Sequence, residues 1–426
     1  MGRLLKKVIR ALVPAPLLSR LLPIYHFLLA FLGACVYRFP SRNLYVIGVT
    51  GTKGKSTTTE LIATILKEAG HSVAYVNTIQ FKIGGTTERN LFKMSMPGRF
   101  FLQRFLYRAR KAGCTHAVLE MTSEGATLYR HRFISLNALV FTNLTPEHIE
   151  SHGSFEKYRD AKLSIRDALS HSRKPEKIIV ANADDPHGAL FLKAHVQNRL
   201  TYTLAEHDVH SDSRSSTLTF QGVAMRSHLP GMFNASNILA AATLTFAMGI
   251  DAKTIKSAVE KVEKIAGRAE HIDEGQAFEV VVDYAHTPES LEALYKTFRM
   301  PKICVLGNTG GGRDAWKRPL MAKIAEQNCA RIVLTNEDPY DEDPLKIIDE
   351  MVAGMKHRPE VILDRREAIA RALSIASRGD AVLITGKGTD PFIMGPRGSK
   401  KEWSDTEVVR EELQKLNRAV PNVHND

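Results

Sequence analysis

The sequence has 426 residues, enough for two or three domains, and its hydrophobic fraction of 44% is typical of a soluble globular protein. Its formal net charge of +12 is concentrated in residues 1–42 and 91–114, which contain basic side chains and no acid. Such clusters attract anions such as lipid headgroups, nucleotides or nucleic acid, or else form solvated helix faces. The four cysteines contain no CxxC pair, which indicates neither a zinc ribbon nor a disulfide framework and favours a reducing cytosol.

An apolar run precedes the first predicted strand. It covers residues 21–37, is interrupted by Pro23 and His26, and is shorter after the proline than the roughly 20 residues that span a bilayer. We therefore expect residues 1–42 to form a basic, apolar helix that lies on the inner surface of the membrane. The alternatives are a helix packed on the body or on a partner, and a signal peptide with the lipoprotein-like sequence LGAC.

Short apolar runs alternate with helical segments from residue 43 onward. The first run, residues 43–48, is followed by a predicted helix over residues 56–69 that ends at Gly70. Further strands are predicted at residues 71–77, 117–120, 138–142, 178–181 and 200–203. This alternation predicts a parallel sheet with helices on both faces, whose ligands bind at the carboxyl ends of the strands. The loops after residues 48, 119, 141 and 180 should therefore converge.

A second α/β unit is predicted from about residue 266. It follows an antiparallel excursion at residues 217–226 and an alanine-rich helix at residues 236–248. Its strands are predicted at residues 279–282, 302–306, 331–334 and 381–384, and the tail from Pro421 is expected to fray. The fold class is thus α/β, with a P-loop parallel-sheet central domain at residues 43–250. A smaller Rossmann-like C-terminal domain is predicted at residues 265–415.

A phosphate-binding loop lies between the first strand and the first helix. Its residues are Gly51, Thr52, Lys53, Gly54, Lys55, Ser56 and Thr57, a variant of the Walker pattern with Val49 in place of the first glycine. Glycines let backbone N–H groups approach phosphate, Lys55 supplies a positive charge, and Ser56 can hold Mg²⁺. The loop predicts ATP binding. Because an exported protein would meet no ATP, it also argues against a signal peptide.

Several later motifs follow the loop in a recurring order. They are the sequence 120–124 (EMTSE), residues 143–153 (NLTPEHIESHG), residues 158–162 (YRDAK), residues 229–237 (LPGMFNASN), residues 267–270 (GRAE), residues 283–288 (DYAHTP) and residues 307–321 (GNTGGGRDAWKRPLM). In this order and spacing, residues 44–412 resemble the Mur ligases, which use ATP to add amino acids to the peptide of a cell-wall precursor. The resemblance is greatest to members that add the third amino acid.

The resemblance implies a metal-binding and catalytic site. Glu120 matches a glutamate that ligates a second Mg²⁺, and His148 matches a metal-site histidine. Lys162 matches a lysine that CO₂ converts to a carbamate, an anionic group suited to bridging to a metal. Two Mg²⁺ ions are expected. The expected metal ligands are Ser56, Glu120, His148 and Lys162, and the expected catalytic residues are Lys55, Lys162, His148 and Arg268.

The resemblance also implies how ATP is bound and how the reaction proceeds. Asn234 and Asn237 would lie near adenine, Asp283 would meet the ribose, and Arg268 would neutralise the γ-phosphate. A substrate carboxylate attacks that phosphate, and the amine of an amino acid then displaces phosphate from the acyl phosphate. Domain closure would bring Arg268 and Asp283 to the loop. The residues assigned to substrate are Ser123, Arg313, Asp338, Tyr340 and Asp390.

Two features depart from the family pattern. Only 42 residues precede the first strand, whereas the family carries an N-terminal domain that holds a uridine nucleotide. The basic segment Arg99–Lys111 could instead hold a membrane-bound or differently tagged muramyl peptide. Tyr340 replaces an arginine that grips diaminopimelate, so the acidic residues 337 and 338 favour a cationic amino acid such as lysine.

Three other interpretations are open. Folylpolyglutamate synthases also begin near their phosphate loop, but they carry GTNGKGS where this sequence has GTKGKST. A membrane-attached regulatory NTPase would leave Arg268, Asp283 and residues 307–321 without a use. A nucleic-acid-binding protein would explain the charge and none of the motifs, so no nucleic acid is expected as a partner. A cytoplasmic ligase, peripheral on the inner membrane surface, is the interpretation that we prefer.

Overall fold

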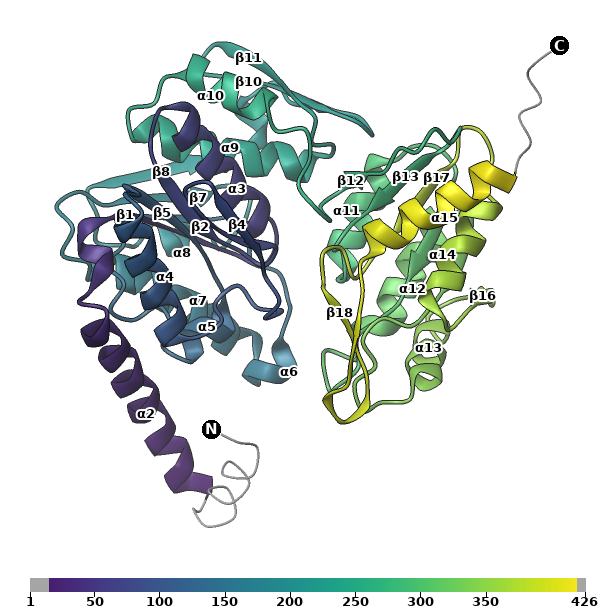
Figure 1. Ribbon diagram of the computed structural model, residues 1–426, viewed down its shortest axis with the longest axis horizontal. Helices are drawn as coiled ribbons and strands as arrows, with labels where there is room; N and C mark the ends of the chain where they lie inside the picture. The colour runs from purple at the N-terminus through teal and green to yellow at the C-terminus, as the bar shows by residue number, and fades with distance from the viewer. Residues whose placement is uncertain (1–14, 420–426) are drawn as a thin grey trace.

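The computed structural model describes residues 15–419, which form two α/β units side by side and one N-terminal helix (Figure 1). The first unit covers residues 45–260 and the second covers residues 270–419. The predicted fraying from Pro421 and the first 14 residues of the predicted N-terminal helix lie outside the described residues. The division of the chain into domains at residues 43–250 and 265–415 stays a prediction.

The first unit is built on an eight-stranded sheet with the order β4-β3-β2-β5-β1-β6-β7-β8. Strands β2, β5, β1, β6, β7 and β8 are parallel, and β3 and β4 add an antiparallel hairpin at one edge. The strands are β1 Tyr45–Thr50, β2 Val73–Val76, β3 Gln80–Ile83, β4 Thr86–Arg89, β5 His116–Met121, β6 Ala138–Phe141, β7 Ile178–Asn182 and β8 Asn198–Tyr202. The predicted parallel strands are confirmed. The hairpin was missed because Thr86–Arg89 is polar and exposed along its length.

Helices bury both faces of this sheet, as its continuous apolar strands require. Helices α3, α9 and α10 pack on one face, and α4, α5, α7 and α8 pack on the other. The helices are α3 Lys55–Glu68, α4 Arg99–Lys111, α5 Ser123–Thr127, α6 Ile149–His152, α7 Phe155–Ser170, α8 Gly188–Phe191, α9 Met232–Ala247 and α10 Ala252–Glu260. The predicted antiparallel excursion is also present, as β9 His210–Ser211, β10 Ser216–Phe220 and β11 Val223–Ser227. Two 3₁₀ turns, η1 Pro40–Asn43 and η2 Leu204–Glu206, complete the unit.

The second unit is a smaller sheet with the order β12-β13-β17-β14-β15-β16. Its four predicted strands are confirmed residue for residue as β13 Glu279–Val282, β14 Lys302–Leu306, β15 Arg331–Leu334 and β17 Ala381–Ile384. Shorter strands are β12 Glu270–His271, β16 Glu360–Val361, β18 Phe392–Met394 and β19 Lys400–Glu402, with η3 at Pro396–Gly398. One face is covered by α11 Pro288–Thr297, α12 Lys317–Asn328 and α13 Pro344–Val352, and the other by α14 Arg365–Ser374 and α15 Asp405–Ala419.

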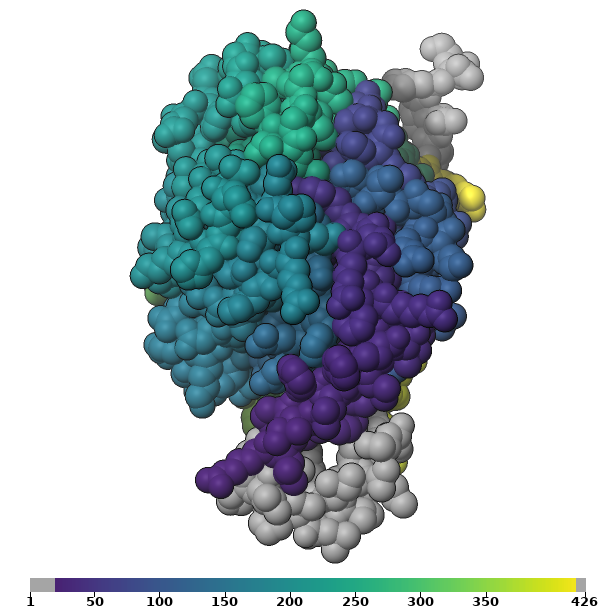
Figure 2. All heavy atoms as spheres, turned by 90° about the vertical axis from the view of Figure 1, so that its left-hand side faces the viewer, coloured from purple at the N-terminus to yellow at the C-terminus, as the bar shows by residue number. Residues whose placement is uncertain are grey.

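The N-terminal helix α2 runs from Ala15 to Val36 and continues through Pro23, so the proline does not divide it as the sequence suggested. It lies against α4, and its Phe27 ring also contacts Phe133 in the loop after α5, with the ring centroids 5.1 Å apart. Figure 1 shows α2 projecting beyond the first unit, and Figure 2 shows its purple side chains uncovered on the outer face. Among residues 15–419, no helix combines the length and apolarity that a bilayer crossing requires.

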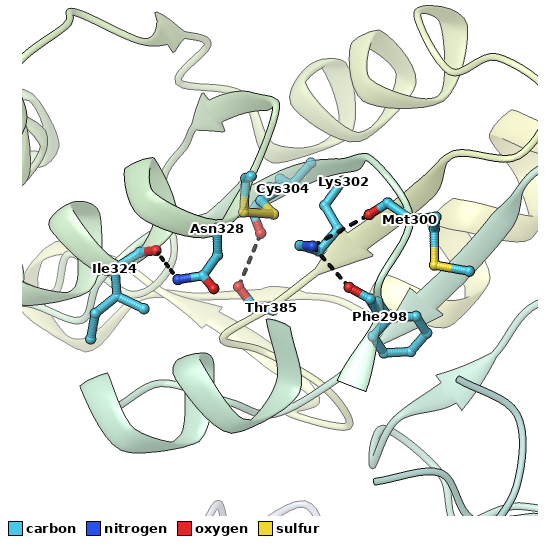
Figure 3. The surroundings of a disulfide bond; sticks show 9 residues. Phe298, Met300, Lys302, Cys304, Ile324, Asn328 and Thr385 are labelled. Atoms are coloured by element: carbon cyan, nitrogen blue, oxygen red, sulfur yellow. Dashed lines mark hydrogen bonds between the residues drawn. A yellow bond between two sulfur atoms is a disulfide. The ribbon is translucent and has the colours of Figure 1, made fainter. Parts of the chain in front are cut away.

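The expectation that the cysteines would form no disulfide is wrong. Cys304 on β14 and Cys329 after α12 are joined, with their Cα atoms 6.1 Å apart (Figure 3). They are 25 residues apart in sequence. They meet because β14 and β15 are parallel neighbours, so the crossover through α12 brings the chain back beside β14 just before β15 begins. Cys35 and Cys114 are unpaired.

This cross-link should stabilise the second unit. We expect Cys329→Ser to lower the free energy of unfolding in oxidising buffer by about 3 kcal/mol, because the bond removes loop-closure entropy from the unfolded chain. Urea denaturation of the parent and the variant, with and without dithiothreitol, measures the difference. Cys35→Ser is the matched control and should leave the midpoint unchanged. If dithiothreitol does not change the urea midpoint of the parent protein, the disulfide has no such stabilising role.

Candidate active site

The turn between β1 and α3 carries the phosphate-binding sequence. Two of its glycines are needed for space, because a Cβ on Gly51 would lie 1.9 Å from Thr142 Oγ1 and one on Gly54 would lie 2.1 Å from Asn237 Oδ1. Gly54 also has a φ of 82°, in the left-handed region that glycine tolerates. The loop backbone thus packs closely against its neighbours, and the N-terminus of α3 follows it directly. This arrangement suits a phosphate group.

Glu120, at the carboxyl end of β5, is surrounded by hydrogen-bond donors. Its carboxylate accepts from Ser56 Oγ at 2.7 Å, from Ser95 Oγ at 2.7 Å, and from the Thr78 N–H and hydroxyl at 3.0 Å each. Burial would raise the pKa of Glu120, but the nearby Lys55 ammonium and these hydrogen bonds together lower it. An ionised carboxylate and a serine hydroxyl therefore lie side by side, and both are oxygen ligands that suit Mg²⁺.

Two lysines donate to carbonyl oxygens of the phosphate loop. Lys55 Nζ donates to Thr52 O at 2.8 Å, and Lys162 Nζ, from α7, donates to Gly51 O at 2.6 Å. Burial lowers the pKa of Lys55, and burial together with the positive charge of Lys55 places the pKa of Lys162 well below its ordinary value. Both amines thus lie at the phosphate loop, and burial disfavours their charged forms unless an anion such as a polyphosphate is bound nearby.

Glu147 links the two units beside the loop. Its Oε1 accepts a hydrogen bond from Lys53 Nζ at 3.0 Å and lies 2.8 Å from Nε2 of His286, which follows β13 in the second unit. A second link comes from Asp314, whose carboxylate accepts a hydrogen bond from the His148 backbone N–H at 2.7 Å. These contacts bring the loop after β6 against the second unit. The predicted convergence of the loops after β1, β5 and β6 is confirmed, and the loop after β7 supports them through Asp185, whose Oδ2 accepts a hydrogen bond from the Leu144 N–H at 2.7 Å.

Two adjoining cavities lie between the units. One has a volume of about 230 Å³ and the other about 260 Å³, and both are lined by Lys53, Gly54 and Arg268. Arg268 belongs to the segment that opens the second unit, and its guanidinium lies 4.5 Å from the ring centroid of Tyr284. A cation from the second unit therefore shares a cavity with the phosphate loop of the first.

The smaller cavity contains most of the predicted metal, catalytic and substrate residues. Those that line it are Thr52, Lys53, Gly54, Lys55, Ser56, Glu120, Ser123, His148, Arg268, Arg313, Asp338, Tyr340 and Asp390. The larger one contains the predicted ATP residues Lys53, Gly54, Thr57, Asn234, Asn237, Arg268 and Asp283. Gly51 and Lys162 line neither of these cavities. Among the described contacts, no hydrogen bond joins Glu120 to Lys162 or to His148. The ring nitrogen Nδ1 of His148 lies 4.0 Å from Oε1 of Glu124 instead.

The residues predicted to bind the adenosine part of ATP are held by local hydrogen bonds. Asn237 Nδ2 donates to Asn234 Oδ1 at 3.3 Å, and its Oδ1 accepts from Thr58 Oγ1 at 3.3 Å. The Asp283 carboxylate accepts from the N–H groups of Ala269 and Ala285 at 2.6 Å each. Burial raises the pKa of Asp283 above its ordinary value. These side chains are fixed before any nucleotide arrives.

A four-charge cluster adjoins the smaller cavity, which three of its members line. Asp338 follows β15 and Asp390 follows β17, and the buried Lys387 donates to both, at 2.9 and 3.2 Å. Lys93, from the first unit, donates to Asp338 Oδ2 at 2.6 Å and lies 2.9 Å from Asp390 Oδ2. Burial would lower the pKa of Lys93, but the two carboxylates raise it above its ordinary value.

Several residues of the site were not identified from the sequence. Glu147 and His286 lie inside two of the quoted motifs, so those motifs contained the signal although it was not used. Asp314 and Lys317 lie in the motif at residues 307–321 in the same way. Thr78, Ser95 and Lys93 lie outside every motif, and only the fold brings them to the cavity.

Known proteins share this sequence and this architecture. Residues 49–245 match the family described as Mur ligase middle domain, and residues 267–388 match the family described as Mur ligase, glutamate ligase domain. A UDP-N-acetylmuramoyl-L-alanyl-D-glutamate–2,6-diaminopimelate ligase of Syntrophomonas wolfei is 36% identical over 404 residues, which cover 91% of this chain and 81% of that protein. This chain belongs to the Mur ligase family. A UDP-N-acetylmuramyl-tripeptide synthetase of a Roseiflexus species is 37% identical over 434 residues, covering 95% and 85%.

Solved structures agree with this assignment. A UDP-N-acetylmuramoyl-L-alanyl-D-glutamate–2,6-diaminopimelate ligase superposes with a TM-score of 0.59 at 31% identity, covering 88% of this Mur ligase and 79% of that chain. A Mycobacterium tuberculosis folylpolyglutamate synthase superposes with a TM-score of 0.69 at 16% identity, covering 87% and 96%, and this likeness shows the fold alone. The chain is thus an ATP-dependent carbon–nitrogen ligase of peptidoglycan synthesis. The folylpolyglutamate synthase and regulatory NTPase interpretations are set aside.

Proposed function

We propose that this Mur ligase joins an amino acid to the free carboxylate of a muramyl-peptide acceptor between its two units. The observation that carries the proposal is the shared cavity, in which the phosphate loop of the first unit faces Arg268 of the second. A carboxylate oxygen of the acceptor attacks the γ-phosphorus of ATP, which releases ADP and forms an acyl phosphate. The amine nitrogen then attacks the acyl carbon, phosphate leaves, and the nitrogen loses a proton to give the amide.

The residues around the loop would position and neutralise the phosphoryl group. Lys55 and Arg268 bring positive charge to the oxygens on which charge develops, which is the main form of catalysis available in phosphoryl transfer. Asn234, Asn237 and Asp283 would hold the adenosine part of ATP in the larger cavity. Thr52, Lys53, Gly54 and Thr57 complete the loop around the phosphates.

The donor set beside the loop fits magnesium. Ser56 and Glu120 offer adjacent oxygen ligands, which suit this hard cation. Magnesium neutralises phosphate charge when it is bound. Among the described residues, no group of three or more His, Cys, Asp and Glu side chains is arranged for a metal, so a two-ion site needs a further anion. We propose that His148 and a modified Lys162 supply the remaining protein ligands.

The position of Lys162 supports its conversion to a carbamate. The neutral amine nitrogen attacks the carbon of CO₂, an N–C bond forms as one C–O π bond opens, and the nitrogen loses a proton, which leaves a carbamate anion in place of the neutral amine. Complete burial beside Lys55 favours the neutral amine, the form that reacts, and lowers the pKa of Lys162 accordingly. The product would place negative charge under the loop, where the parent ammonium would repel a metal.

Loss of either lysine should abolish ligation. We expect Lys55→Ala and Lys162→Ala to lower the turnover of ATP with acceptor and amino acid by roughly 100-fold or more, the range seen when one preorganised electrostatic group is removed. ADP release measures this turnover. Lys157→Ala, on an exposed position of the same helix as Lys162, is the matched control and should retain full activity. Near-normal turnover of Lys162→Ala would contradict the carbamate.

The four-charge cluster supports an assignment for the amino-acid side. We propose that Ser123, Arg313, Asp338, Tyr340 and Asp390 line the position of the incoming amino acid, since they share the cavity with the phosphate loop. Arg313 lies 5.3 Å from the ring centroid of Tyr340, so these two side chains form one wall. The carboxylates of Asp338 and Asp390 favour an amino acid with a second positive charge, such as lysine.

We further propose that the ligase works in the cytoplasm, peripheral on the inner membrane surface. Helix α2 exposes large apolar side chains by 41–57%, namely Leu21, Leu22, Ile24, Tyr25, Phe27, Leu28, Phe31, Leu32 and Val36. Arg99, Arg104, Arg108, Arg110 and Lys111 lie on α4, against which α2 packs. An apolar helix beside basic side chains matches an anionic lipid surface. The same basic helix would favour an acceptor that carries a lipid-linked or otherwise anionic tag.

Binding to vesicles tests the membrane contact. We expect the full chain to sediment with phosphatidylglycerol vesicles, less with phosphatidylcholine vesicles, and less at high salt, because screening weakens the attraction of α4. Leu28→Glu should weaken binding by roughly tenfold or more, since a leucine contributes about 1.5–3 kcal/mol when buried. The control is Leu345→Glu, a leucine exposed to a similar extent on α13. Equal binding by both variants would contradict the contact.

A further inference from the structure

Lys93 holds the place where a positive charge of the substrate would be expected. Its ammonium lies within 2.6 Å of Asp338 and 2.9 Å of Asp390, the two carboxylates assigned above to the amino acid. We propose that Lys93 is an internal occupant of the cation-binding position of the amino-acid site and determines its specificity. An amino acid with a second ammonium must displace Lys93. The inference rests on the proposed function, because it concerns the same site.

The charges of the cluster are balanced without any substrate. Two carboxylates, Asp338 and Asp390, face two ammonium groups, Lys387 and Lys93. A third ammonium in the same place would leave an excess of positive charge away from water, which is costly. One of the two lysines must therefore leave when a cationic side chain enters.

Lys93 is the lysine that can leave. Both lysines donate to Phe392 O, Lys387 at 2.6 Å and Lys93 at 3.4 Å, but only the side chain of Lys387 is completely buried in the core of the second unit. The side chain of Lys93 is 17% exposed and reaches the cluster from the other unit. It lies in residues 90–98, which form no helix or strand. Displacing it breaks contacts between units without opening a core.

The backbone at Lys93 indicates that the ion pairs hold it in place. Its φ is 53°, in a region that side chains other than glycine rarely adopt. The flanking residues are fixed, because Asn90 Nδ2 donates to Asn77 O at 2.8 Å and Ser95 Oγ donates to Glu120 Oε1 at 2.7 Å. The contacts of Lys93 thus offset a strained conformation, and the strain would be relieved when a substrate takes its place.

The segment also connects the amino-acid position to the metal position. Ser95 bonds Glu120, two residues from the lysine that bonds Asp338. Displacement of Lys93 would move the backbone next to Ser95, the residue that donates a hydrogen bond to Glu120. A cationic amino acid can bind only to molecules in which Lys93 has left the site. Its apparent affinity is therefore lower than its intrinsic affinity, in proportion to the fraction of molecules in which the site is free.

Kinetics with two amino acids that differ only by the terminal ammonium group test this role. The substrates are L-lysine and its uncharged analogue L-norleucine, with ATP and a muramyl dipeptide acceptor. In Lys93→Met we expect the KM for lysine to fall roughly tenfold, with the KM for norleucine unchanged. Lys93→Arg keeps the charge and should retain the parental KM values. Lys193→Met, at an exposed position of the first unit, is the matched control and should change neither value.

The experiments test the role of Lys93 separately from the proposed ligase function. Equal changes of both KM values in Lys93→Met, or a higher KM for lysine, would overturn the role of Lys93 as an occupant. Calorimetric titration of L-lysine into the full chain gives a readout that needs no turnover, and Lys93→Met should bind lysine more tightly there as well. If no amino acid supports ligation by the parent, the proposed function fails, while the calorimetric comparison still decides the role of Lys93.

Discussion

The buried carboxylate of Glu147 is the interaction on which the site depends. It accepts a hydrogen bond from Lys53 of the phosphate loop and lies against His286 of the second unit, so one group fixes the loop and joins the two sheets. Lys53, His148 and His286 outweigh the effect of burial and hold the pKa of Glu147 well below its ordinary value. Removing such a carboxylate would leave its buried partners unpaired. This contact therefore joins the two units beside the cavity in which we propose that ATP and acceptor meet.

Charge compensation explains how the other charged side chains are arranged around the two cavities. Lys53, Lys55 and Lys162 crowd the phosphate loop, and Glu120 and Glu147 partly neutralise them. A polyphosphate would supply the missing negative charge, and a metal would then restore the balance at Glu120. The same balance of charge is present at the position that we propose for the amino acid, where Lys93 and Lys387 neutralise Asp338 and Asp390. Each half of the site is prepared for a charged ligand by side chains of the chain itself.

The sequence predicted those parts of the fold in which local pattern and tertiary structure agree. Strands such as Glu279–Val282 are short apolar runs buried on both faces, so their pattern was sufficient. The hairpin strand Thr86–Arg89 was missed because it is exposed and polar. The Cys304–Cys329 disulfide was missed because 25 residues and a helix separate two cysteines that only the crossover unites. Lys93 gave no signal for a related reason, since its partners Asp338 and Asp390 lie in the other unit.

As proposed above, one cavity joins an ATP-activated carboxylate to an amine. Sustained ADP release by the full chain, measured with a panel of amino acids and with muramyl dipeptide acceptors that carry or lack UDP, tests it most directly. We predict turnover only when ATP, an acceptor and an amino acid are all present, with a cationic amino acid among the substrates. Equal ATP turnover in the absence of every amino acid would contradict the account.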